Sequence, residues 1–138
     1  KGYAVIKRVW KDGDTVTLDL DMEPEFIQAN PKVRADVGKV AIQRGPLVYC
    51  IEEVDNGKNL PAISIDTGAG LTLERDRILE EEIVVIKGKG TKADEASWSE
   101  ELYRTYTRSE IPVDIKAVPY FIWGNRAPGE MLVWIRCK

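Results

Sequence analysis

The chain has 138 residues, of which 43% are hydrophobic and 31% charged, and its formal net charge at pH 7 is −3. This length and composition are typical of one globular domain, or of one domain with a piece of another, and argue against intrinsic disorder. No apolar run approaches the roughly 18 residues of a membrane helix. No block of basic residues offers the positive patch typical of a nucleic-acid binder. We therefore expect neither a membrane nor a nucleic acid as a partner.

The residue types that the chain lacks restrict its chemistry. It has no histidine and two cysteines, Cys50 and Cys137. A Ser–His–Asp or Cys–His nucleophilic site cannot be built from this chain alone. Structural zinc usually takes four Cys or His ligands, so we expect no metal site and no cofactor. Two cysteines are too few for a disulfide scaffold, although the sequence leaves open whether they pair.

The first segment predicts a pair of strands. Val and Ile together number 26 against nine Leu, and β-branched side chains suit a pleated sheet. Val16, Leu18 and Leu20 alternate with polar neighbours, as in a strand with one wet face. Lys11–Asp14 has the composition of a turn. We therefore expect an antiparallel hairpin over Tyr3–Met22.

The middle of the chain predicts further short strands. Pro24 and Asn30-Pro31 indicate a loop, with at most a short helical turn, over Glu23–Asp36. The expected strands that follow are Lys39–Arg44 and Leu47–Glu52, with a bulge or bend at Gly45-Pro46 between them, then Ala62–Asp66 and the apolar run Ile83–Ile86. Asp55–Asn59 is expected to turn, Leu73–Glu82 to be a loop with one helical turn, and Gly88-Lys89-Gly90 to end the apolar strand.

The C-terminal part predicts two strong strands. These are Val113–Trp123 and Met131–Cys137, and the seven residues Gly124–Glu130 are expected to join them as a hairpin loop. Asp94–Glu101 is polar and loop-like. The total of about eight to ten short strands, at a spacing of roughly 8–12 residues, is typical of an all-β sandwich or barrel. We expect an antiparallel, jelly-roll-like β-sandwich.

Acidic side chains are the first candidates for chemistry, since a glycosidase without histidine could use two carboxylates. Glu80-Glu81-Glu82 and Glu52-Glu53 are the acidic runs. Neighbouring residues in a strand point to opposite faces, so an adjacent pair does not converge on one substrate. Glu80 and Glu82 could share a face, but a solvated rim explains them better. An independent glycosidase is therefore the weakest alternative, and we expect no catalytic residue in this chain.

Aromatic side chains are the second candidates. Tyr120, Trp123 and Trp134 could stack on sugar rings, and Trp123 and Trp134 flank the last loop as expected cross-strand neighbours. Packing in a core or against another domain is the favoured explanation, because large aromatics dominate interiors. Two arginines, Arg44 just before Gly45-Pro46 and Arg126 in the last predicted loop, are the charged residues of most interest, since a loop arginine most often satisfies backbone carbonyls or a carboxylate. Cys50 is expected to be a buried, inert thiol.

Three segments carry a family resemblance. The first contains Gly2-Tyr3, Ile6, Arg8, Trp10 and Gly13-Asp14, the second is Arg44–Cys50, and the third is Ala117–Trp134. In this order they resemble the region after the catalytic domain in glycoside hydrolase family 127, the β-L-arabinofuranosidase family. Ile83–Gly88 and Leu102–Arg104 resemble weaker landmarks between them.

The resemblance implies a parent enzyme built from a catalytic (α/α)6 barrel followed by β-sandwich domains. It places the nucleophilic cysteine, the acid–base glutamate and the zinc-binding cysteines in the barrel, and no position here matches those motifs. Cys50 in particular does not correspond to the nucleophile. We therefore expect residues 1–138 to form one non-catalytic sandwich unit, with residues 1–50 belonging partly to a preceding sandwich. Its implied role is to brace the barrel and to help a homodimer form, and the alternative is a carbohydrate-binding module.

Overall fold

The computed structural model describes residues 2–138 and builds them almost entirely from strands and loops. The described strands are β1 (Pro24–Gln28), β2 (Lys39–Arg44), β3 (Leu47–Glu52), β4 (Ile63–Ile65), β5 (Thr72–Ile78), β6 (Glu81–Ala93), β7 (Glu110–Pro119), β8 (Met131–Leu132) and β9 (Ile135–Cys137). The helical elements are single turns: η1 (Arg34–Asp36), α1 (Glu53–Asn56), η2 (Leu60–Ala62), η3 (Glu95–Ser97) and η4 (Tyr120–Ile122). The predicted all-β class with eight to ten strands is confirmed. None of the described helices has the length and apolarity needed to cross a membrane.

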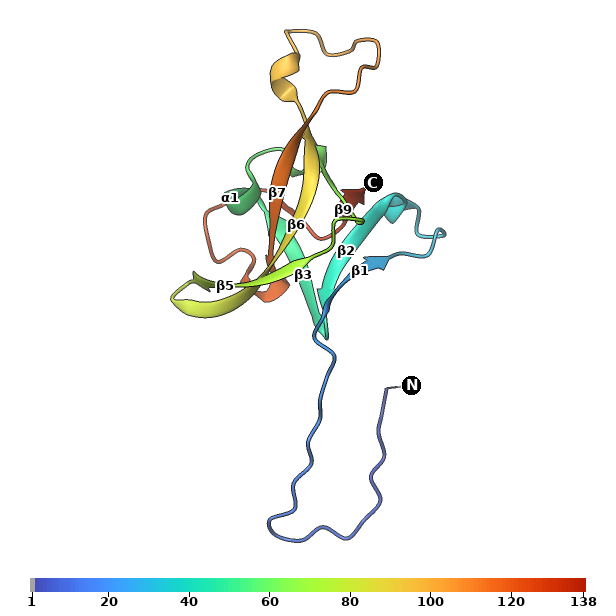
Figure 1. Cartoon of the computed structure of the whole chain (residues 1–138), viewed down its shortest axis with the longest axis vertical. Coiled ribbons are helices and arrows are strands. Elements are labelled where there is room, and N and C mark those ends of the chain that lie inside the picture. The colour runs from blue at the N-terminus through green and yellow to red at the C-terminus, as the bar shows by residue number, and fades with distance from the viewer. Residues whose placement is uncertain (1) are drawn as a thin grey trace.

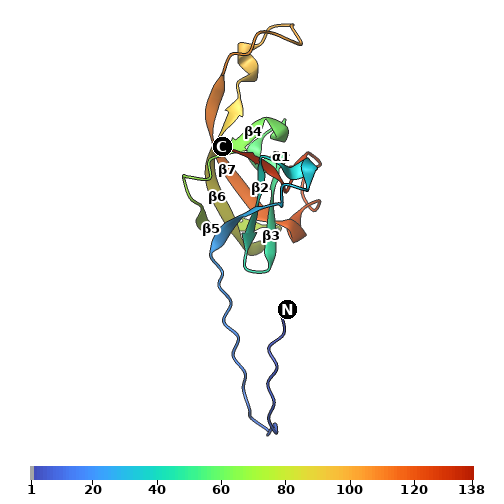
Figure 2. The same ribbon diagram turned by 90° about the vertical axis from the view of Figure 1, so that its right-hand side faces the viewer.

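The strands form one continuous sheet that closes on itself (Figures 1 and 2). The pairing runs β1-β2-β9-β4-β6-β7-β3-β8, and β2 also pairs with β3, so that six strands from β2 round to β3 make a ring. β5 lies outside the ring as a hairpin partner of β6. The β4–β9 pair is parallel, whereas the other pairs are antiparallel, so the sheet is mixed rather than purely antiparallel as expected.

Two apolar clusters hold this sheet together. The larger fills the ring, and each of its six strands contributes to it, as with Ile42 from β2, Ile86 from β6 and Ile135 from β9. The smaller lies on the outer side of β3, β6 and β7 and includes Cys50 and Val118. Alternate residues of these three strands therefore point into opposite cores, and this wall is buried on both faces.

The predicted hairpin over Tyr3–Met22 is wrong. Residues 2–22, termed the arm, run out from the body and back as extended chain without strand pairing (Figure 1). The predicted turn is present, since the amide of Asp14 donates to the carbonyl of Lys11 at 3.1 Å. The alternating side chains have no surface to cover, and Leu18 is 77% exposed. A two-stranded hairpin on its own is marginally stable at best in water, so alternation alone does not produce one.

Other boundaries also differ from expectation. Pro24–Gln28, expected as loop, forms β1, and Thr72–Ile78 forms β5, which pairs with β6 along its whole length. β6 does not end at Gly88-Lys89-Gly90 but continues to Ala93. Gly45-Pro46 is a two-residue turn between β2 and β3 rather than a bulge, because Arg44 pairs directly with Leu47.

The predicted C-terminal hairpin is also wrong. Gly124–Glu130 connects two segments that do not pair with each other, because β3 lies between β7 and β8. The segment Met131–Cys137 is split, so that β8 pairs with β3 while β9 pairs with β2 and β4. Because the segment is split, its side chains pack against both apolar clusters.

Candidate functional site

Residues 94–109, termed the lobe, project from the ends of β6 and β7 on the side of the body opposite the arm (Figure 1). The two ends of the lobe are tied together. The amide of Asp94 donates to the carbonyl of Ser109 at 3.0 Å, and the hydroxyl of Ser109 donates to the carboxylate of Asp94 at 3.1 Å. A loop whose ends meet in this way is a compact Ω-like loop, a class that frequently carries function.

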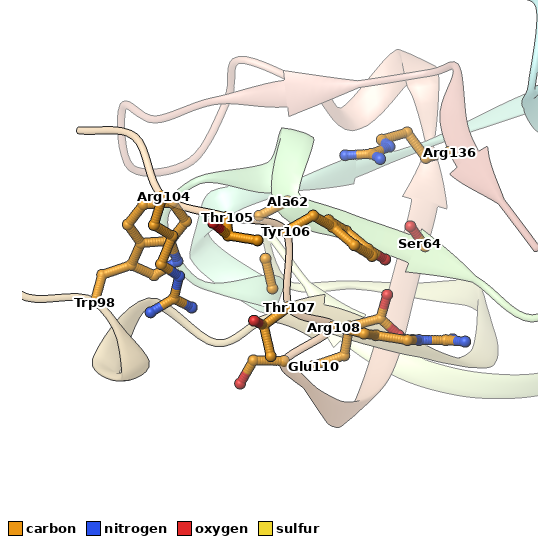
Figure 3. A pocket seen from close by; sticks show the side chains of 12 residues that line it. Ala62, Ser64, Trp98, Arg104, Thr105, Tyr106, Thr107, Arg108, Glu110 and Arg136 are labelled. Atoms are coloured by element: carbon orange, nitrogen blue, oxygen red, sulfur yellow. The ribbon is translucent and has the colours of Figure 1, made fainter. Parts of the chain in front are cut away.

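A cavity of about 310 Å³, termed the lobe pocket, lies between the lobe and the outer face of the sheet (Figure 3). At one end, the Arg104 guanidinium lies 4.1 Å from the centre of the Trp98 ring and donates to the carbonyl and hydroxyl oxygens of Ser97. The lining comes from four strands, η2 and the lobe: Ala62, Ser64, Ala93, Trp98, Arg104, Thr105, Tyr106, Thr107, Arg108, Ser109, Glu110 and Arg136. The site thus joins chain segments that are far apart in the sequence.

The sheet side of the lobe pocket carries unpaired positive charge. Arg136 on β9 lies opposite Lys39 on β2 and opposite Ser64 on β4, so all three side chains share one face. Neither Arg136 nor Lys39 forms an ion pair or a side-chain hydrogen bond with another residue among those described. Like charges directly opposite each other across two strands are destabilising. The fold therefore sets Arg136, which lines the pocket, directly opposite a second cation, Lys39, and no acidic residue of the described chain forms an ion pair with either.

One carboxylate, that of Glu110, lines the pocket next to the lobe. Glu110 accepts hydrogen bonds from Arg108 and from the Thr91 hydroxyl, each at 3.0 Å, and lies 3.6 Å from the Lys138 ammonium. The hydrogen bonds from Arg108 and Thr91 hold the pKa of Glu110 below its ordinary value. The pocket lining thus contains three guanidinium groups and one carboxylate, in a chain whose overall charge is −3.

The three aromatic residues proposed from the sequence lie away from the lobe pocket. Tyr120 and Trp123 sit on and just after η4, with ring centroids 5.7 Å apart and exposed fractions of 44% and 43%. Trp134 is half-buried in the link between β8 and β9. No strand pairing joins Trp123 to Trp134 in the described chain, so the structure brings together the first two of these residues and not the third.

The most buried charges form an ion cluster beside α1. Arg126 pairs with Glu52 and with Asp55, the latter at 2.6 Å, and Lys116 bridges Asp55 at 2.9 Å and Asp76 at 2.6 Å. Burial acts to raise the pKa of Asp55, but the hydrogen bonds from Arg126 and Lys116 outweigh it, and the pKa lies below its ordinary value. Each of the three carboxylates thus contacts at least one of the two cations, which makes the cluster a structural clamp rather than an acid–base pair.

The other acidic runs do not converge either. Glu53 accepts a hydrogen bond from the backbone amide of Glu130 at 3.0 Å, whereas Glu52 binds Arg126. Glu82 pairs with Arg75 on the exposed face of the β5–β6 hairpin, and Glu80 is exposed in the turn of that hairpin. The predicted solvated rim describes these residues well.

The two cysteines are free thiols. Burial, together with the nearby negative charge of Glu52, raises the pKa of Cys50 to about 12, so this thiol stays protonated and poorly nucleophilic at neutral pH. The predicted burial of Cys50 is confirmed. Within residues 2–138, no group of three Cys, Asp or Glu side chains is arranged to hold a metal ion.

Sequence reasoning found Arg126 and missed the lobe pocket. Arg126 stood out because a loop arginine needs a partner, and its partners are Glu52 and Asp55. The pocket left one signal, the polar and basic stretch Arg104–Arg108, but its other wall comes from Ser64 and Arg136, whose proximity depends on the sheet order.

Comparison with known proteins gives a consistent result. Residues 24–136 match the family model described as the glycoside hydrolase family 127 C-terminal domain. A non-reducing end beta-L-arabinofuranosidase of Bifidobacterium longum subsp. longum is 37% identical over 131 residues, covering 90% of this chain and 20% of that protein.

Solved structures show the same relation. A GH127 beta-L-arabinofuranosidase from Geobacillus stearothermophilus T6 matches with a TM-score of 0.80 and 47% identity, over 85% of this chain and 18% of that one. A second glycoside hydrolase matches with a TM-score of 0.78 and 39% identity, over 96% of this chain and 22% of the other. A GH127 beta-arabinofuranosidase matches with a TM-score of 0.67 and 31% identity, over 86% and 18%. The chain spans about a fifth of the length of these relatives.

Proposed function

The chain belongs to glycoside hydrolase family 127 as its C-terminal domain, and on this premise we propose that it is the non-catalytic sandwich of an enzyme acting on arabinofuranosides. Its role is to pack against the catalytic (α/α)6 barrel of the parent protein and brace it. Two features support the non-catalytic role: each carboxylate of the ion cluster is paired with a cation, and the Cys50 thiol is buried, with a raised pKa.

The observation that carries the bracing role is the apolar arm. It exposes eight large hydrophobic side chains, namely Tyr3, Val5, Ile6, Val9, Trp10, Val16, Leu18 and Leu20. Exposed apolar side chains gathered on one segment in this way mark an interaction site. The end of the arm packs closely against the body, because the Met22 side chain occupies the space that a side chain on Gly45 would need. We infer that the arm completes a neighbouring module of the parent enzyme.

This inference sets the domain boundary. Of the 138 residues predicted as one unit, the arm then belongs to a preceding sandwich. Residues 23–50 instead belong to the domain that contains the ring of strands, because β2 supplies Val40 and Ile42 to the larger core. The boundary we propose therefore lies just before β1.

Activity measurements test the non-catalytic role. We expect the 138-residue chain to show no turnover of an aryl β-L-arabinofuranoside, while the parent enzyme carrying the same residues hydrolyses it. Leu18→Lys in the parent should lower its thermal stability, with Thr17→Lys, on the other side of the same strand-like segment, as the matched control. Turnover by the chain alone would overturn the proposal, and so would equal stability of the two variants.

A carbohydrate-binding module is the second candidate, and the exposed Tyr120–Trp123 pair favours it. Trp134 was grouped with this pair from the sequence and serves as a third test position. Titration with arabino-oligosaccharides, followed by tryptophan fluorescence, should give a shift that Tyr120→Ala removes and Tyr103→Ala keeps. The absence of any shift at millimolar sugar rules this candidate out. Homodimer formation through the same domain is a further proposed role, to be measured in the parent by sedimentation.

A further inference from the structure

We propose that the lobe pocket binds an acidic saccharide, a sugar of one or two rings that carries a carboxylate. Arg136, Arg108 and Arg104 supply the charge that recognises the carboxylate, and Tyr106 supplies the surface that recognises the ring. This site is separate from the Tyr120–Trp123 pair, which lies on η4.

The charge argument begins with Arg136 and Lys39. They stand directly opposite each other on β9 and β2, without an acidic partner among the described residues. A bound anion would relieve this cross-strand repulsion, whereas a neutral ligand would leave it in place. Guanidinium groups bind carboxylates through paired hydrogen bonds, so Arg136 at the pocket wall is suited to this anion.

The lobe supplies the opposite wall. In the view of Figure 3 the Tyr106 ring is drawn between Arg136 on one side and Arg108 on the other, and all three residues line the pocket together with Ser64. Arg108 is held in place by Glu110, and Arg104 by Trp98 and Ser97. Neither arginine therefore needs to be ordered when a ligand arrives, which lowers the entropic cost of binding.

The ring argument rests on Tyr106 and the hydroxyl groups. Tyr106 is 85% exposed at the pocket, and an aromatic face in that position offers a stacking surface for the apolar face of a sugar. The hydroxyls of Ser64, Thr105 and Thr107 line the same cavity and can exchange hydrogen bonds with sugar hydroxyls. A volume of about 310 Å³ is at the lower end for small-molecule sites, which fits one or two rings.

The saccharide part of this inference rests on the proposed function, since a glycoside hydrolase meets glycans, whereas the carboxylate part rests on the arginines alone. A free carboxylate and inorganic phosphate share the anionic chemistry, so both belong in the test. The two proposals fail separately, because arabinofuranoside turnover by the parent enzyme does not depend on whether this pocket binds a uronate.

Calorimetric titration of the 138-residue chain with digalacturonate tests the site. We expect binding, and at least about tenfold weaker binding in Arg136→Gln, the loss of one charge-assisted contact. Arg75→Gln, on the far β5–β6 hairpin, is the matched control and should bind like the original chain. Tyr106→Ala should also weaken binding, while Tyr103→Ala, an exposed tyrosine of the same lobe outside the pocket lining, should not. Thermal stability of Arg136→Gln should be unchanged or higher, because the variant removes a repulsion.

Four results would overturn the proposal. The first two are an affinity for the neutral disaccharide galactobiose, or for acetate or inorganic phosphate, that equals the affinity for digalacturonate. The third is no binding at 20 mM digalacturonate, a concentration that corresponds to a binding free energy of about 2.3 kcal/mol. The fourth is binding to the isolated chain that is lost in the parent enzyme. The last result would mean that the pocket is covered by another part of the parent, so that its cations serve an acidic protein surface instead of a sugar.

Discussion

At the scale of single residues, Arg126 carries more stability than any exposed charge in the chain. Its partners Glu52 and Asp55 are almost fully buried, with side-chain exposures of 6% and 9%. Arg126→Ala leaves Glu52 without a cation and leaves Asp55 with Lys116 alone, and removing one partner of a buried pair costs about 3–5 kcal/mol. We expect a loss of this size in urea unfolding. Arg75→Ala, which breaks the exposed pair with Glu82, should cost about 0–1 kcal/mol, and a loss that small for Arg126 would contradict the clamp.

Asp55 should make stability depend on pH in the acidic range. Burial opposes its ionisation, but the hydrogen bonds from Arg126 and Lys116 prevail, and the folded-state pKa lies below the ordinary 3.8. The folded protein therefore releases this proton more readily than the unfolded chain, and the stabilisation is complete above the unfolded-state pKa and lost as the pH falls through the folded-state pKa. Between pH 7 and pH 3 the free energy of unfolding should fall less steeply in Asp55→Asn than in the original chain. Equal slopes in the two proteins would refute the assignment.

At the scale of elements, the two glycines of β6 explain how this strand can pass so close to its neighbouring strands. A side chain on Gly90 would collide with the Ser64 backbone oxygen and lie 2.8 Å from Ile115. A side chain on Gly88 would meet only the flexible ends of Ile65, at 3.2 Å, and Leu71, at 3.3 Å. We expect Gly90→Ala to destabilise by about 1–3 kcal/mol or more, Gly88→Ala by less, and Gly2→Ala on the arm not at all. Thermal unfolding ranks the three variants, and equal values for Gly90→Ala and Gly2→Ala would disprove the close approach.

The same elements show what pattern reasoning could predict. β2, β3, β4 and the start of β6 follow from alternating or continuous apolar residues. The β5–β6 hairpin was missed because its turn residues, Leu79 and Glu80, both adopt positive φ angles, at 53° and 68°. Such turns normally use Asn, Asp or Gly, and so this turn carries no recognisable composition. The sequence predicts a strand end at Gly88–Gly90, whereas the close approach of a neighbouring strand that requires these glycines is a property of the tertiary fold.

At the scale of the whole molecule, the order of the strands decides the candidate site. Arg136, Ser64 and Lys39 become neighbours only because β9 lies between β2 and β4. No local pattern encodes that order, and the apparent C-terminal hairpin argued for a different one. The family resemblance was predictable from continuous segments such as Arg44–Cys50, whereas the pocket depends on side chains from separate ones.

The arm exposes eight large hydrophobic side chains, and we expect the isolated chain to self-associate through it. Val16, Leu18 and Leu20 are each more than half exposed and lie on one side of an extended segment. Extended backbone with free hydrogen-bonding groups and an apolar face readily pairs with a second copy. Light scattering should show an apparent mass that rises with concentration. Leu18→Lys should suppress the rise, while Thr17→Lys, on the opposite side of the same segment, should keep it. Since the arm does not pair with the body, both variants should keep the circular dichroism of the original chain, which separates association from misfolding. A clean monomer at high concentration would show that the arm does not need a partner, and it would remove the observation on which the bracing role depends.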